Sequence, residues 1–495
     1  MDSSAQPVRP LGPCEIFSAS RHQPGFYKCV ASTCRYSVPV ESLRGQAIGD
    51  ALETAIAHVV LALPSLRVGI VGQETSKPYF VQLPSINLDH HLECLVEPTA
   101  DLSTQEAGLL GILQDQHDRS WPEIEQRPPW KLTAIVRPPT SDDGLQVVDV
   151  VFAVHHAIAD GRSTTYFHSK LLAELNQQNG RPAQLSGHIL TMAGDVKLDP
   201  PQEELVNFTK SWAFLLGTLW RELAPAWLQR RPPPAPWTGK VVTREPCRTR
   251  LRLVTIPAVA VPRILAACRA HQTTLTPLLH ALILASLARR VPPEEARALR
   301  GSNPIDMRPF IKRDPKTGGS VNPFGSFVST QSHYFGAPTI ARLRESALDD
   351  EIWELAAELR GSMKEHLDKI PADDIMSMLA WIGDWQKYWL AKVGKPRQDT
   401  WEVSNVGSMP GVQDASEETI QGWRIQRCIM SQSASVAGPA IELSVAGITG
   451  GDICIVLGLQ EGIVETGIVD GLAADLRCWL DRLGHEGKLT QEVLS

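Results

Sequence analysis

The sequence lacks the features that would place the protein among disulfide-rich, metal-binding or membrane-spanning classes. Its nine cysteines form no CxxC pair, and their scatter over 495 residues predicts reduced thiols and no bound metal. No apolar run approaches the roughly 20 residues that a membrane-spanning helix needs. The N-terminus has no basic-then-apolar signal pattern, so we expect a cytoplasmic protein.

Several catalytic and binding motifs are also missing. The chain has no GxSxG elbow, GxxxxGKS/T loop, GxGxxG fingerprint or HExxH pair. These absences leave a serine nucleophile of the α/β-hydrolase type, a P-loop, a dinucleotide fold and a zinc protease without support. The net charge of -7 and the pI near 6.1 argue against nucleic-acid binding, which normally requires a basic stripe.

The length and one proline-rich segment predict two lobes. A chain of 495 residues exceeds the usual size of one hydrophobic core. The segment RRPPPAPWTG excludes both a helix and a central strand. We therefore place a linker or crossover at 230–245, between an N-terminal lobe at 1–229 and a C-terminal lobe at 246–495. Helical and strand-like patterns occur in both halves, which predicts an α/β fold with one helix-covered sheet in each lobe.

Two local patterns bear on the organisation of the N-terminal lobe. The apolar segments at 130–138 and 145–154, joined by PTSDDG, predict a β-hairpin, and 162–180 predicts a helix that ends at a glycine. The amphipathic stretch at 211–229 predicts a helix packed on the body or over an opening. We favour that reading over peripheral membrane contact, although interfacial helices share the pattern.

The most informative segment is HHAIADG, which follows the predicted strand at 145–154. A chance HHxxxDG match is expected only on the order of 10⁻³ times in a chain of this composition. An imidazole at a strand end can act as a general base, because its ordinary pKa of about 6.5 lets it accept a proton at neutral pH. Asp160 can then lock the turn or orient the ring, and Gly161 can permit a tight bend. We favour this interpretation over a purely structural pair, His155 and His156.

HHxxxDG resembles the signature of the acyltransferase superfamily built on the chloramphenicol acetyltransferase fold. That superfamily includes BAHD acyltransferases, condensation domains of peptide synthetases and fungal alcohol O-acetyltransferases. The last branch looks most similar, because RHQPGFY, LPSLRVGI, RPPWKL and WEVSNVG fit its pattern along nearly the whole chain. The chain lacks the DFGWG motif of BAHD enzymes, and SNVG stands roughly where that motif would fall. The resemblance implies two lobes with a solvent tunnel between them.

The resemblance also assigns roles to the motif. His156, the second histidine, corresponds to the general base, and His155 is expected to shape the turn. Asp160 is expected to point away from the substrate and to pair with Arg308 of IDMRPF. The alternative is that Asp160 only caps the helix that starts near Ser163, which needs no arginine.

Further candidates follow from the expected reaction. An oxyanion needs a preorganised hydrogen-bond donor. The candidates for that donor and for substrate contact are Ser404 and Asn405 in SNVG, or Gln432 and Ser433 in MSQSAS. The cations that could bind the phosphates of coenzyme A lie in two basic segments that otherwise read as solvated loops: Lys312, Arg313, Lys395 and Arg397.

The resulting hypothesis is transfer of an acetyl or other short acyl group from acyl-CoA to the hydroxyl of a small molecule or secondary metabolite. The base would be His156, with no covalent intermediate and no permanently bound cofactor; an amine acceptor is the lesser option. We expect a monomer. Three alternatives stay open: condensation with an acyl group on a carrier protein, a cavity reused for a different reaction, and a binding protein that keeps the fold without catalysis.

Overall fold

The predicted hairpin forms the middle of the first sheet. In the computed structural model, which describes residues 6–97, 101–137, 144–177, 179–223, 233–312, 321–345, 348–410 and 422–489, two long strands pair antiparallel from Trp130 opposite Val154 to Arg137 opposite Val147. The five strands of this sheet are, in spatial order, β15 (Arg424–Gln432), β2 (Val30–Pro39), β8 (Leu145–Val154), β7 (Trp130–Arg137) and β6 (Leu92–Val96). β8 is buried along its last seven residues, which explains its unbroken apolar run.

Helices cover the first sheet. α4 (Gly161–Gln177) packs on β2 and against α2 (Ile48–Ala62), and the Phe152 and Phe167 rings stack with their centroids 3.7 Å apart. α3 (Leu102–Asp118) instead contacts the first strand of the second sheet. Smaller sheets lie at the periphery: β1 (Gln6–Pro10), β4 (Tyr79–Gln82) and β3 (Val68–Val71) in one, and β5 (Ser85–Asn87), β10 (Ile189–Thr191) and β9 (Leu185–Ser186) in the other.

The second sheet belongs to the C-terminal half. Its spatial order is β11 (Thr249–Ile256), β17 (Ile453–Gln460), β16 (Ile441–Ile448), β14 (Trp401–Met409), β12 (Ala298–Asp306) and β13 (Val328–Gly336). The apolar helix α8 (Leu275–Arg290) is buried along most of its length. The other helices of this half are α7 (Val261–Ala270), α9 (Ala337–Glu345), α10 (Leu348–Lys369), α11 (Trp385–Leu390) and α12 (Thr466–Glu486).

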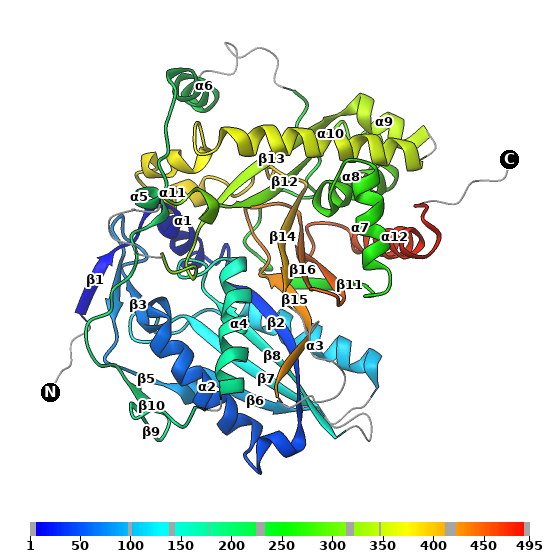
Figure 1. Cartoon of the computed structure of the whole chain (residues 1–495). Coiled ribbons are helices and arrows are strands. Elements are labelled where there is room, and N and C mark those ends of the chain that lie inside the picture. The colour runs from blue at the N-terminus through cyan, green and yellow to red at the C-terminus, as the bar shows by residue number, and fades with distance from the viewer. Residues whose placement is uncertain are drawn as a thin grey trace.

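One strand crosses between the halves. β15 comes from the C-terminal half of the sequence but pairs with β2, with Cys428 opposite Cys34 and Gln432 opposite Val30. Figure 1 shows it as the orange strand that reaches into the blue and cyan lobe. The core of the N-terminal lobe also contains Val406, Met430 and Ile448. A division of the chain at the proline-rich linker, as the sequence suggested, therefore leaves out this exchange of a strand.

The amphipathic stretch at 211–229 differs from its prediction. The described part is α6 (Trp212–Leu223), and Figure 1 shows it standing apart from the two lobes. Its apolar stripe is exposed, with Trp212 at 80%, Leu216 at 62% and Trp220 at 53%. The prediction that this face packs on the body is thus wrong, the option that the helix lies over an opening stays a prediction, and residues 224–229 lie outside the described part. No helix in the described ranges is long and apolar enough to cross a bilayer.

A buried ion cluster ties the hairpin to its neighbour. The Asp149 carboxylate on β8 accepts hydrogen bonds from Arg35 at 2.8 Å and from Arg137 at 2.7 Å, and Arg137 also lies 2.8 Å from Glu97. Arg137 and Asp149 are both buried. A charge this deep depends on its partners, because losing one leaves the other uncompensated.

We predict that Asp149→Ala lowers the free energy of unfolding by about 3 kcal/mol, because it leaves the buried Arg137 with only one carboxylate. Denaturant titration measures the change. The control is Asp470→Ala, which removes the half-exposed partner of Arg252 and should cost at most about 1 kcal/mol. Equal losses in the two variants would contradict this role for Asp149.

Candidate active site

The turn after β8 is built around His155. This side chain is buried, and its Nδ1 accepts a hydrogen bond from the backbone N–H of Ala157 at 3.0 Å. Its own backbone N–H donates to the Pro129 carbonyl at 2.9 Å, which holds the end of β8. The imidazole therefore shapes the turn, as predicted, and turns the next residue toward the interior between the lobes.

His156 lines a cavity of about 270 Å³ whose walls come from both lobes, including α1 (Pro13–His22), β12, β13, β14 and β16. Burial and, to a smaller extent, the Arg21 guanidinium lower the pKa of His156 to about 4, although the Asp160 charge partly opposes both. The ring is therefore neutral at neutral pH and has a lone pair free to accept a proton. Its Nδ1 has no hydrogen-bond partner on another described residue.

The predicted ion pair of Asp160 is present. Arg308 Nη2 lies 2.9 Å from Asp160 Oδ1, and the same oxygen accepts from the Ser163 N–H, also at 2.9 Å. The other oxygen accepts from the Phe327 N–H at 2.9 Å. The carboxylate thus caps α4 and binds the arginine at once, so the two alternatives coexist. Burial would raise the pKa of Asp160, but the Arg308 charge and these hydrogen bonds hold it below its ordinary value.

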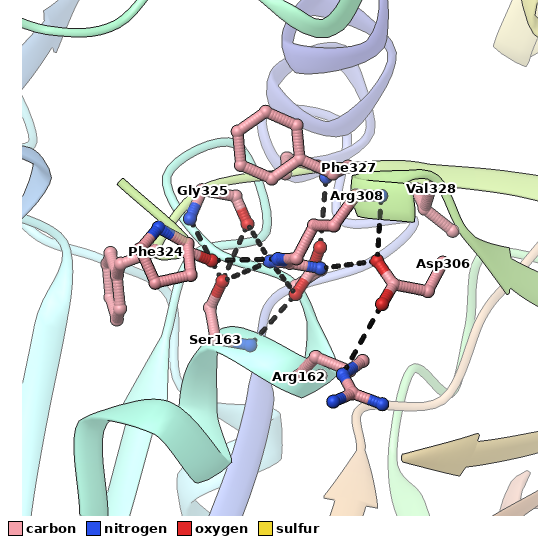
Figure 2. A network of polar contacts seen from close by, with 12 residues as sticks. Arg162, Ser163, Asp306, Arg308, Phe324, Gly325, Phe327 and Val328 are labelled. Carbon is pink, nitrogen blue, oxygen red and sulfur yellow. Dashed lines mark hydrogen bonds and ion pairs between the residues drawn. The ribbon is translucent and has the colours of Figure 1, made fainter. Parts of the chain in front are cut away.

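Arg308 connects the two lobes at this point, as Figure 2 shows. Its guanidinium donates to Asp306 Oδ1 and to Ser163 Oγ, both at 2.9 Å, and to the Pro323 carbonyl at 2.8 Å. Arg162 adds an ion pair to Asp306 at 3.4 Å. The start of α4 in one lobe is therefore fixed to the end of β12 in the other.

Gly161 is needed for a different reason from the one predicted. Its backbone does not adopt a positive φ, so no special bend requires glycine. Instead, an added Cβ would lie 2.5 Å from Met430 Cε and 2.9 Å from Val406 Cγ1. The first turn of α4 passes too close to β15 and β14 for any side chain.

The four candidates for the oxyanion donor do not lie in equivalent places. Ser404, Asn405 and Gln432 line the cavity. Asn405 Nδ2 donates to Thr276 Oγ1 at 3.0 Å. Gln432 Oε1 accepts from the Tyr27 hydroxyl at 3.1 Å. Ser433 is buried outside the cavity lining, and its Oγ accepts from the N–H groups of Lys28 and Cys29. Its hydroxyl therefore supports a loop, and we no longer count it as a site residue.

The structure brings together two of the four predicted phosphate-binding cations, Lys395 and Arg397. Lys312 is exposed, and Arg313 lies outside the described residues. Lys395 lines a second cavity of about 450 Å³, which shares Arg21 with the first. Arg397 is buried, and its guanidinium donates to the carbonyls of residues 240 and 436 and to a glutamine at position 460. Arg397 nevertheless lines the same cavity as Lys395, so its assignment to phosphate binding stays a prediction.

Four cavity residues escaped the sequence analysis as site residues: Arg21, Tyr27, Glu402 and Glu442. The sequence predicted the strand or loop around each of them. Polar residues are usually exposed, however, so the sequence did not indicate that these four are buried between the lobes. A usable signal does exist in the repeated E-x-S pattern of WEVS and IELS. The described residues contain no cluster of three or more His, Cys, Asp or Glu arranged to hold a metal.

The chain is similar to known proteins over most of its length. A sequence profile of the Alcohol acetyltransferase family matches residues 121–466. The chain is 31% identical to "Probable alcohol acetyltransferase FCK4" of Fusarium pseudograminearum, over 97% of this chain and 96% of that protein. The chain belongs to the alcohol acetyltransferase family. It is also 27% identical to "Probable alcohol acetyltransferase crmB" of Aspergillus fumigatus, over 92% of this chain and 96% of that protein.

Solved structures confirm the two-lobe fold of the wider superfamily. TRI3 trichothecene 15-O-acetyltransferase from Fusarium sporotrichioides superimposes with a TM-score of 0.64 at 12% identity, covering 94% of each chain. The condensation domain of the Monacolin K polyketide synthase MokA gives 0.56 at 14% identity, over 99% of this chain and 100% of that one. The expectation of an acyltransferase of this family is thus confirmed, which leaves the donor and the chemistry at His156 to be argued.

We predict that Gly161→Ala lowers the free energy of unfolding by about 1–3 kcal/mol, because the new methyl group must displace the Met430 and Val406 side chains. Denaturant titration measures it. The control is Gly111→Ala in α3, where an added Cβ meets nothing within 4 Å and helix propensity should stabilise by up to about 1 kcal/mol. A neutral Gly161→Ala would contradict the close-packing argument.

Proposed function

We propose that this alcohol acetyltransferase moves a short acyl group from acyl-CoA to the hydroxyl of a small molecule, with His156 as general base. The observation that carries the proposal is the position of the His156 side chain, which lines a cavity between both lobes and follows a turn fixed by buried contacts. A base must be unprotonated before it can act, and burial provides that state here.

The reaction follows from the position of this lone pair. His156 takes the proton of the acceptor hydroxyl while its oxygen attacks the thioester carbonyl. The carbonyl π electrons move to oxygen, and the tetrahedral intermediate then collapses as the carbon–sulfur bond breaks. The thiolate of coenzyme A receives the proton from the imidazolium. Holding both substrates at one histidine supplies much of the rate, and no covalent enzyme intermediate is required.

The oxyanion of that intermediate needs a donor within the same cavity. Ser404 and Asn405 lie on β14, which starts in the core of the C-terminal lobe and ends in that of the N-terminal lobe, and Gln432 lies at the end of β15. Ser404 is the candidate we favour, because Asn405 Nδ2 already donates to Thr276 Oγ1 and Gln432 Nε2 to Ser444 Oγ at 3.4 Å. A hydroxyl held on a strand is preorganised, since little reorientation accompanies the charge that develops.

Asp160 and Arg308 are positioning residues in this mechanism. Both carboxylate oxygens of Asp160 are occupied by protein donors, so the group does not act on substrate. It fixes the loop that carries His156. Its negative charge also favours the imidazolium that forms when the proton is transferred.

The alternatives differ in donor or in chemistry. Condensation domains share the fold, so an acyl group on a carrier protein is the second candidate donor. Turnover with free acetyl-CoA and none with an acetylated carrier protein would support the proposal; the reverse would replace it. A non-acyltransferase reaction in the same cavity, or a binding role, would show neither.

We predict that His156→Ala lowers kcat/KM for acetyl transfer by about 10²–10⁴-fold, because the variant keeps positioning but loses proton transfer. Rates are measured by release of free coenzyme A, with acetyl-CoA and a panel of alcohols. The control is His90→Ala, which changes an exposed histidine of a second His-His pair. Full activity in His156→Ala with an unchanged melting temperature would refute the mechanism.

The acid limb of the pH profile should reflect the low pKa of His156, about 4. A base with a lowered pKa stays active above that value, so kcat/KM should hold as pH falls through 6.5 and decline only below about pH 5. Glu402 is measured in parallel as Glu402→Gln, because burial raises its pKa to about 7 and it could add a separate limb. An acid limb centred near 6.5 in that variant would contradict the prediction.

A further inference from the structure

Two neighbouring strands carry the same polar pattern, and Glu402, Ser404 and Glu442 of this pattern line the cavity. β14 and β16 are parallel and in register, with Glu402 opposite Glu442 and Ser404 opposite Ser444. The alternate residues of both strands belong to the core of the C-terminal lobe. Because side chains alternate across a strand, the glutamates and serines share the opposite face, which the cavity borders. We call Glu402 and Glu442 the glutamate pair.

The glutamate pair is incompletely partnered. Glu442 is 4% exposed, and its Oε2 atom is buried without a hydrogen-bond partner among the described residues. Glu402 is bonded to Gln432. Arg21 and Arg397 both act electrostatically on Glu442. The Arg21 guanidinium, on α1, lies over the rings of Phe17 and Tyr27 at 4.3 and 4.5 Å. It forms no ion pair with either glutamate within 4 Å.

Burial sets the charge of this group. Burial raises the pKa of Glu402 to about 7 and that of Glu442 well above its ordinary value, with Glu402 adding to the effect on Glu442. Burial therefore favours the protonated form of Glu442, in which a carboxyl group can both donate and accept a hydrogen bond. A buried polar atom without a partner costs free energy, so a group that persists in a ligand cavity is expected to find its partner on the ligand.

We propose that the glutamate pair binds a second, non-reacting hydroxyl group of the acceptor, so that the acceptor class is diols and polyols. This inference rests on the proposed acyl transfer to an alcohol. A neutral carboxyl group matches a neutral hydroxyl in donors and acceptors, whereas an ammonium group would face Arg21 in the same cavity. The anionic end of coenzyme A would gain nothing from carboxyl groups, which argues for the acceptor as the molecule recognised.

The test uses matched probes and does not depend on turnover. Cyclohexanediol and cyclohexanol are titrated against the full-length protein without acyl donor, and binding is followed by the rise in melting temperature. We expect the wild type to bind the diol about 10-fold more tightly, as one additional buried hydrogen bond predicts. Glu442→Met should remove that preference, and Glu442→Gln should retain most of it, because an amide also donates and accepts.

Stability separates this role from a structural one. Glu442→Met removes a polar group without a partner, so the ligand-free protein should be as stable as the wild type or more stable. The control is Glu53→Met, which changes an equally buried glutamate that is paired with Arg181 and His188. It should lower the melting temperature and leave the preference for the diol intact.

Three outcomes would overturn the inference: equal binding of the two probes by the wild type, an unchanged preference in Glu442→Met, or a rise in the KM for acetyl-CoA in that variant. The diol preference is also measured in His156→Ala. If it persists there while acetyl transfer is absent from the wild type, the proposed function fails and the glutamate pair still stands as a hydroxyl site.

Discussion

The ion pair between Asp160 and Arg308 is the constraint on which the placement of His156 depends. Asp160 starts α4, and Arg308 follows β12 of the other lobe, so a single carboxylate fixes the loop and joins the lobes. Its environment makes the pair strong, because both partners are largely buried and the remaining donors of Arg308 reach Asp306 and Ser163. A cavity between two lobes keeps its shape only if the lobes stay fixed in position relative to each other. The crossing strand β15 supplies the same restraint from the opposite side of the motif, by backbone pairing with β2.

The electrostatics of the cavity follow from enclosure. Burial disfavours whichever form of a group is charged, so it lowers the pKa of His156 and raises those of Glu402 and Glu442. The result is an interior in which burial favours the unprotonated form of the base and the protonated form of the carboxyl groups. The positive charge of Arg21 lowers the pKa of all three groups. It therefore adds to the effect of burial at His156 and opposes the effect of burial at the glutamates. One cation therefore favours a neutral base while limiting how far the carboxyl pKa values rise.

The sequence predicted the parts of this arrangement that are local or that a motif records. The hairpin of β7 and β8, the turn at His155 and the helix α4 follow from periodicity and turn residues within a few positions. The contact between Asp160 and Arg308 spans 148 positions and came only from resemblance to a family. What the sequence could not give was proximity between lobes. Gly161 is required because Met430 and Val406 lie where its Cβ would be. Arg397 can be buried because carbonyl groups of distant loops accept its hydrogen bonds. Neither leaves a periodic signal in the chain.

The repeated E-x-S pattern shows how such a signal could still be read. A glutamate in a strand of alternating pattern is ordinarily a solvent-facing residue, and one copy carries no information about a site. Two copies on strands that pair in parallel and in register must place like side chains next to each other. Two neighbouring carboxylates repel each other when they are buried, unless one of them is protonated or binds a ligand. Placing Glu402 next to Glu442 thus costs folding free energy, and packing of the lobe does not require it. The same reasoning does not extend to Ser404 and Ser444, since two neighbouring hydroxyl groups can hydrogen-bond to each other without an added proton or a ligand. A search for functional side chains in folds of this kind should therefore start from repeated charged positions on adjacent strands, where the sheet itself forces the conflict.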